Sequence, residues 1–246
     1  MGARQVLATD PTVLADLATV RLGTSQFRRV LIRLADEDFD GPSLLPGWSR
    51  RHLVAHVGYN ARAIARLVTW AATGEETPMY PSPETRAAEI EAGATLRPDA
   101  LRSLCEHAAM DLDVRWRDLP DARWAEPVRT AQGRTVPVSE TLWMRTREVW
   151  LHAVDLDARA RFDEIPPAVL ARVLGDVVGA WEKRGELDGL AVTTEGPDGA
   201  IRLGDRSGSR EVTGTLVEVV EWATGRARPS SSLKWAGEMQ PAPRWL

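Results

Sequence analysis

The sequence has a single cysteine, Cys105, among its 246 residues. It therefore forms no internal disulfide and suits a reducing compartment. No apolar run is long enough to span a bilayer, and residues 1–10 lack the apolar core of a signal peptide. Internal repeats and a glycine-rich phosphate-binding loop are also missing. We expect a soluble, cytoplasmic protein.

Positive charge is not concentrated in any segment. The formal net charge is −4, and the charges are mixed along the chain. The sequence thus offers no basic block for nucleic acid or for an anionic membrane, and we expect neither as a partner. Arginine far outnumbers lysine, which suits the recognition of carboxylates.

Helical periodicity dominates the first two thirds of the chain. Apolar residues recur at helical spacing over residues 11–34, 49–72, 98–119 and 139–156, and a shorter helix is expected at 84–91. Ser49 is expected as the N-cap of the second helix. Proline-containing loops, including 73–83 and 120–137, separate the helices. The pattern predicts a mainly α fold built on a four-helix bundle.

The pattern changes near residues 161–167, where we place a domain boundary. Residues 1–162 are expected to form the bundle, and residues 163–246 a small α+β domain. In the second domain we expect a helix at 168–184 and a last helix at 216–226. Short β-like runs at 190–194, 200–203 and 211–215 predict a short antiparallel sheet.

One continuous polar stripe runs along the helix at 139–156. It comprises Thr141, Arg145, Glu148, His152, Asp155 and Arg159. Glu148 and His152 lie one turn apart and point the same way, so both could bind one metal ion such as zinc. The alternative is a solvated helix face on which Glu148 pairs with Arg145 and His152 with Asp155.

The second helix carries two of the four histidines. His56 lies about 60° from the centre of the apolar face and His52 about 100° from it, so His56 points further inward. His56 could be a third ligand or a hydrogen-bonded core residue, whereas His52 is expected at the partly exposed surface. His107 is interpreted as structural. Cys105 falls on a core face and is expected to be a buried structural thiol, so a reactive thiol would have to come from outside.

Three segments of the sequence resemble the mycothiol-dependent maleylpyruvate isomerase family. They read LPGWSRRHLVAHVGYNA at 45–61, TGEETPMY at 73–80 and REVWLHAVDL at 147–156. The closing Pro-Arg-Trp-Leu also fits, so the resemblance covers nearly the whole chain. The N-terminal two thirds resembles the wider DinB-like superfamily of metal-binding four-helix bundles.

The resemblance implies a zinc site formed by His56, Glu148 and His152, with His52 outside it. It implies a reaction in which the thiolate of mycothiol adds to the cis double bond of maleylpyruvate, the resulting single bond rotates, and elimination leaves fumarylpyruvate. This step belongs to gentisate-type aromatic degradation. Two histidines and one carboxylate leave a coordination position open, as a catalytic zinc requires.

The resemblance also implies an essential arginine near the end of the last helix, which is Arg226 here. It would bind a carboxylate of the dicarboxylate substrate or the developing enolate. The alternative is a cation that only faces the helix dipole.

Three other functions stay open at this point. One is a related mycothiol-dependent S-transferase, and another is a non-haem iron enzyme, since two histidines and a carboxylate also hold iron. The third is a non-catalytic module that binds a small ligand.

Overall fold

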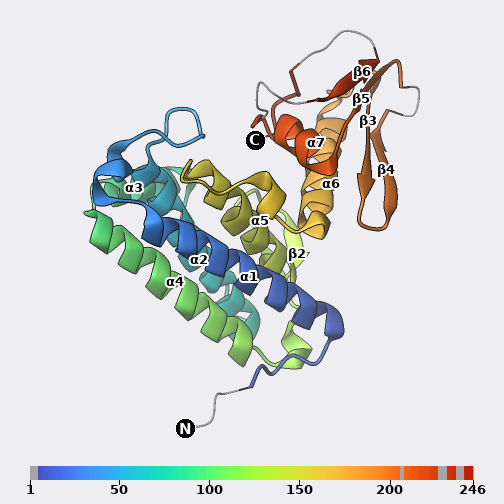
Figure 1. Cartoon of the computed structure of the whole chain (residues 1–246). Coiled ribbons are helices and arrows are strands. Elements are labelled where there is room, and N and C mark those ends of the chain that lie inside the picture. The colour runs from blue at the N-terminus through green and yellow to red at the C-terminus, as the bar shows by residue number, and fades with distance from the viewer. Residues whose placement is uncertain (1–4, 206–207, 227–231, 237–240, 246) are drawn as a thin grey trace. The chain divides into compact units, whose positions relative to one another are not determined.

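The structure is a computed structural model that describes residues 5–205, 208–226, 232–236 and 241–245. Leu246, the last residue of the closing Pro-Arg-Trp-Leu, lies outside the described residues. The chain folds into two compact units, Met1–Ala160 and Arg161–Leu246 (Figure 1). Within the described ranges, no helix is long and apolar enough to cross a membrane.

Unit 1 is the predicted helical bundle. Its long helices are α1 (Pro11–Arg33), α2 (Arg50–Thr73), α4 (Pro98–Asp118) and α5 (Glu140–Asp155), and its shorter ones are α3 (Pro83–Ala94), η1 (Asp36–Asp40) and η2 (Asp121–Arg123). The mainly helical fold class is thereby confirmed, and the helices begin and end close to the predicted positions. Ser49 stands at the N-cap of α2, but its side chain makes no capping bond; its Oγ lies 2.7 Å from Nδ1 of His52 instead.

Two of the long helices, α2 and α4, run parallel to each other. A Cβ on Gly58 would lie 2.7 Å from Leu104, and further along both helices Arg115 donates to the Thr69 hydroxyl at 2.7 Å. Two parallel helices cannot be joined by a short turn, because the chain must first return to the starting end. Residues 74–97 make this return and include α3.

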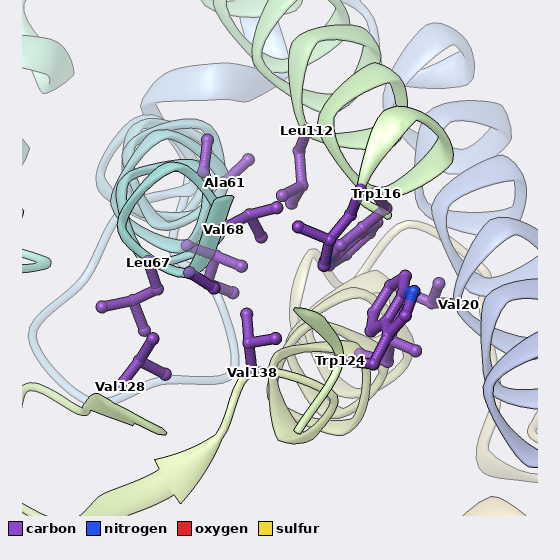
Figure 2. Packing of buried hydrophobic residues seen from close by; sticks show 14 of the residues in the cluster. Val20, Ala61, Leu67, Val68, Leu112, Trp116, Trp124, Val128 and Val138 are labelled. Atoms are coloured by element: carbon purple, nitrogen blue, oxygen red, sulfur yellow. The ribbon is translucent and has the colours of Figure 1, made fainter. Parts of the chain in front are cut away.

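The core at one end of the bundle gathers side chains from the helices and from the segment before α5. Figure 2 shows Leu67, Val68, Leu112, Trp116, Trp124, Val128 and Val138 in this cluster. Val128 belongs to β1 (Pro127–Arg129), which pairs antiparallel with β2 (Thr135–Pro137). The expected loop at 120–137 therefore contains a short hairpin, and the prediction of a plain loop was wrong. Strands of three residues with one buried side chain each are too short to show an alternating pattern.

The contact between α1 and α5 depends on Gly23. A Cβ at this position would lie 2.6 Å from Nε1 of Trp150 and 2.7 Å from Cγ2 of Val149. Trp150 and Val149 are both buried, so neither side chain can swing away to make room. The absent side chain of Gly23 therefore lets the two helices approach closely.

Unit 2 combines helices with a small sheet. The elements are η3 (Phe162–Glu164), α6 (Pro167–Arg184), β3 (Leu190–Gly196), β4 (Gly199–Gly204), β5 (Arg210–Thr213), α7 (Leu216–Ala223) and β6 (Lys234–Ala236). Among the described residues the strand order is β4-β3-β5-β6. The β3–β4 and β5–β6 ladders are antiparallel, as expected for the sheet, whereas β3 and β5 are parallel. This follows from the chain path, since β4 returns along one edge of β3 and β5 then runs along the other edge in the direction of β3.

We expect Gly23→Ala to lower the free energy of unfolding by about 1–3 kcal/mol. Overpacking against α5 should outweigh the gain in helix propensity, which is about 1 kcal/mol. Gly175→Ala in α6 is the control, because a Cβ there meets no atom within 4 Å and should raise the stability by up to about 1 kcal/mol. Urea unfolding followed by circular dichroism measures both variants. A stabilised Gly23→Ala protein would contradict the close α1–α5 contact.

Candidate metal centre

His56 enters the interior of the bundle from α2. It is 6% exposed, and it lies on the inward face that the helical period predicted. Its ring packs edge-on to Trp48 at 5.3 Å and to the ring of His152 at 5.2 Å. Its Nε2 lies 2.8 Å from Oε2 of Glu148, a residue 92 positions further along the chain. Packing of α2 against α5 thus places the imidazole of His56 next to the carboxylate of Glu148.

Glu148 and His152 extend from α5 one turn apart. Nε2 of His152 lies 3.3 Å from Oε2 of Glu148, so the same carboxylate oxygen faces both imidazoles. The alternative prediction of a solvated stripe was wrong. Arg145 and Asp155 are buried, and Glu148 meets the two histidines rather than Arg145. The predicted pair of His152 and Asp155 is present, at 2.8 Å.

The protonation of the cluster follows from its burial and its hydrogen bonds. Burial lowers the pKa of His56, although Glu148 opposes the effect. Burial also disfavours charge on His152, but the bonds to Asp155 and Glu148 outweigh it and raise the pKa of His152 to about 9. For Glu148, burial acts against ionisation, yet the bonds from His152 and His56 hold its pKa well below the usual range. Without metal, the cluster at neutral pH is a carboxylate between one charged and one neutral imidazole.

This set of atoms fits a zinc ion. Nitrogen and oxygen ligands bound at 2.0–2.1 Å in a tetrahedron are about 3.3 Å apart, close to the 2.8 Å and 3.3 Å measured between Glu148 and the two imidazoles. Asp155 bonds to Nδ1 of His152, which fixes the tautomer that presents Nε2 to an ion. In the part of the chain that the structure describes, His56, Glu148 and His152 form the group whose ligand atoms lie within 4.8 Å of one another.

The remaining histidines and Cys105 stay outside this group. His52 contacts Ser49 and lies 3.4 Å from Glu91, near the bundle surface. His107 is exposed on α4. The Cys105 thiol is buried and donates to the Val54 carbonyl at 3.3 Å, and burial raises its pKa to about 12. It is therefore a neutral structural thiol, as the sequence predicted.

Arg226 lies in unit 2, just after α7. Its backbone N–H donates to the Glu221 carbonyl at 2.6 Å, and its Nη1 donates to the Thr224 carbonyl at 2.8 Å. These bonds satisfy carbonyls of the last helical turn, as a cation at a helix end does.

Two neighbours of the centre, Arg86 and Tyr80, were not predicted from the sequence. Nη2 of Arg86, on α3, lies 3.4 Å from Nδ1 of His56, and the guanidinium also lies over the ring of Tyr80 at 6.0 Å. Both residues belong to the return segment between α2 and α4. Their position depends on the path of that segment, which no periodicity in the sequence encodes.

Comparison with known proteins decides the family. Residues 20–157 match the family model of the mycothiol maleylpyruvate isomerase N-terminal domain. The chain belongs to this family. A crystal structure of the mycothiol-dependent maleylpyruvate isomerase is 46% identical, with a TM-score of 0.88 over 95% of this chain and 97% of that chain. A histidine-to-alanine mutant of that isomerase matches with the same values. The sequence has no match among curated proteins.

We expect the purified protein to carry about one zinc per chain. Replacing His56, Glu148 or His152 with alanine should lower the occupancy strongly, because each removes one of three donors. His52→Ala is the matched control on α2 and should keep the metal. Elemental analysis by mass spectrometry after dialysis measures the content, and circular dichroism confirms folding. Full occupancy in a folded His56→Ala protein would contradict this ligand set.

Proposed function

We propose that the protein is a zinc- and mycothiol-dependent isomerase that converts maleylpyruvate into fumarylpyruvate. The observation that carries the proposal is the convergence of His56, Glu148 and His152 in a member of this family. The 46% identity to a solved isomerase over nearly the whole chain supports the same substrate and the same thiol cofactor.

The buried charges around the centre favour an anionic further ligand. Without metal, the negative Glu148 and Asp155 contact protonated His152, while the cationic Arg145 and Arg86 lie nearby without an ion pair to either carboxylate among the described residues. A zinc ion in place of the His152 proton would add one positive charge to these groups. Since an uncompensated buried charge is costly, the loaded centre would prefer a thiolate to a neutral thiol.

The chain's own residues supply the positions of the candidate ligands. Glu148 holds both imidazoles, and Asp155 fixes the orientation of His152. Bound at this centre, zinc would keep a thiol sulfur as its thiolate at neutral pH. A double bond does not rotate thermally at a useful rate. The thiol of mycothiol supplies a removable bond to one alkene carbon, so that the carbon–carbon bond turns as a single bond before the sulfur leaves.

Arg226 is the proposed carboxylate-binding residue of the reaction. Maleylpyruvate carries two carboxylates, and the chain has a net charge of −4, so the substrate needs a local cation. The planar guanidinium of Arg226 offers paired donors to a carboxylate or to the developing enolate, which a lysine cannot do. The expected compartment is the reducing cytoplasm, where a thiol cofactor stays reduced.

The first test of this function is turnover of maleylpyruvate by the zinc-loaded protein with and without mycothiol. We expect fumarylpyruvate to form only with mycothiol, and removal of the metal by a chelator to abolish turnover. Glutathione at the same concentration is the control thiol. Equal rates without any thiol would contradict the proposal. Accumulation of a stable mycothiol adduct would instead identify an S-transferase.

The second test concerns Arg226. We expect Arg226→Lys to lower kcat/KM by roughly tenfold to a hundredfold, because it keeps the charge but loses the paired donors, and Arg226→Ala to lower it further. Arg202→Lys, a partly exposed arginine of the same unit, is the control and should keep its activity. Zinc content and unfolding should not change. Normal kinetics of a folded Arg226→Ala enzyme would contradict the proposed role of Arg226 in carboxylate binding.

A further inference from the structure

The α1–α4 side of the bundle is incompletely closed. α1 packs mainly on α5 and α4 mainly on α2, while α1 and α4 touch each other little. A pocket of about 400 Å³ opens between them. Arg21 and Asp113 join the two helices at 2.6 Å, and Arg28 and Glu106 join them at 2.7 Å. The pocket volume lies within the range that holds small organic ligands.

The pocket is apolar along its walls and charged at one inner position. Buried apolar side chains from α1 and α4 line it, namely Val20, Phe27, Leu31, Leu112 and Trp116. Ile32 and Met110 line it as well and are each 61% exposed. Its lining also includes Arg145 of α5, which is 2% exposed. The candidate metal ligands are not among the lining residues.

Arg145 carries a buried charge and has hydrogen-bond donors to spare. Its Nη1 donates to the Val57 carbonyl at 2.8 Å and to Oδ1 of Asn60 at 2.9 Å. Within the described residues, its Nε and Nη2 donate no hydrogen bond, and no carboxylate forms an ion pair with it. The two spare groups form one edge of the guanidinium and donate in parallel. This edge matches the two oxygens of a carboxylate.

Within the described residues, the other ionisable groups around the pocket form no ion pair with Arg145. Glu106 and Asp113 are paired with Arg28 and Arg21. The Cys105 thiol stays neutral, because burial raises its pKa. Glu148, one turn along α5, accepts from the two histidines and acts on Arg145 only through its charge. A buried cation with spare donors and no paired anion is energetically costly. An anion that enters the pocket is therefore attracted by the charge of Arg145 and accepts hydrogen bonds from its spare N–H groups.

We propose that the α1–α4 pocket binds an apolar monocarboxylate. The carboxylate lies on the Nε–Nη2 edge of Arg145, and the apolar body fills the space between α1 and α4. This site is separate from the proposed isomerase reaction and does not depend on it.

The probe pair is octanoate and octanol, titrated by calorimetry into the zinc-loaded full-length protein. We expect octanoate to bind about tenfold to a hundredfold more tightly than octanol, because both chains bury similar apolar surface but only the acid meets Arg145. The Met110 methyl group, assigned by comparison with Met110→Leu, should shift in the NMR spectrum on binding. Equal affinity of the two probes, or no binding, would overturn the proposal.

Substitutions locate the site. Ala109→Phe adds a ring at a partly exposed position that lines the pocket, and it should abolish octanoate binding. His107→Phe places the same ring on an exposed position of α4 that does not line the pocket, and it should not alter binding. Arg145→Gln should bind octanoate no better than octanol. Ala109→Phe keeps the test decisive if Arg145→Gln does not fold.

Two alternatives to this binding mode are tested. Octanoate could bind at the metal centre, and a second copy of the chain could occupy the pocket. His56→Ala protein is therefore titrated in parallel and should keep its affinity; loss of binding there would overturn the proposal. Sedimentation tests whether a second copy of the chain covers the pocket. A dimer that Ala109→Phe disperses, without any binding of octanoate, would also overturn it.

Discussion

One carboxylate oxygen, Oε2 of Glu148, joins helices α2 and α5 at the candidate metal centre. It faces His56 of α2 at 2.8 Å and His152 of α5 at 3.3 Å. A charged group at this depth is tolerated only when its partners stay in place, so the relative position of α2 and α5 and the state of the centre are coupled. Asp155 behind His152 extends the same network.

The residues of this network could be read from the sequence because each depends on a single helix. The spacing of Glu148 and His152 places them on one face, and the helical period of α2 turns His56 inward and His52 toward the surface. The helices themselves follow from repeating apolar residues, and the structure has them close to the expected ends. The meeting of His56 with Glu148 and His152 could be predicted only from the family resemblance, because the helical period carries no information about which helices are neighbours.

Other features depend on contacts between distant segments, and the sequence does not contain a local signal for them. The hairpin β1–β2 has only one buried side chain in each strand. The burial of Arg145 depends on acceptors from α2, Val57 and Asn60, so a residue that reads as part of a polar surface stripe lies inside the protein. The parallel order of β3 and β5 is likewise a property of the chain path.

The parallel direction of α2 and α4 has a consequence for how this architecture can diversify. The return segment runs backward along α2: Thr77 bonds to the Arg66 carbonyl, Gly93 lies against Ala55, and the Leu96 carbonyl accepts from Arg51. It must therefore pass the level of His56, and it carries Arg86 to that ring. Met79 and Ile90 anchor this connection in the core, whereas most of its other side chains, Arg86 included, are at least partly exposed. The partly exposed side chains of the connection can therefore change beside His56 without repacking the core that holds the candidate ligands in place.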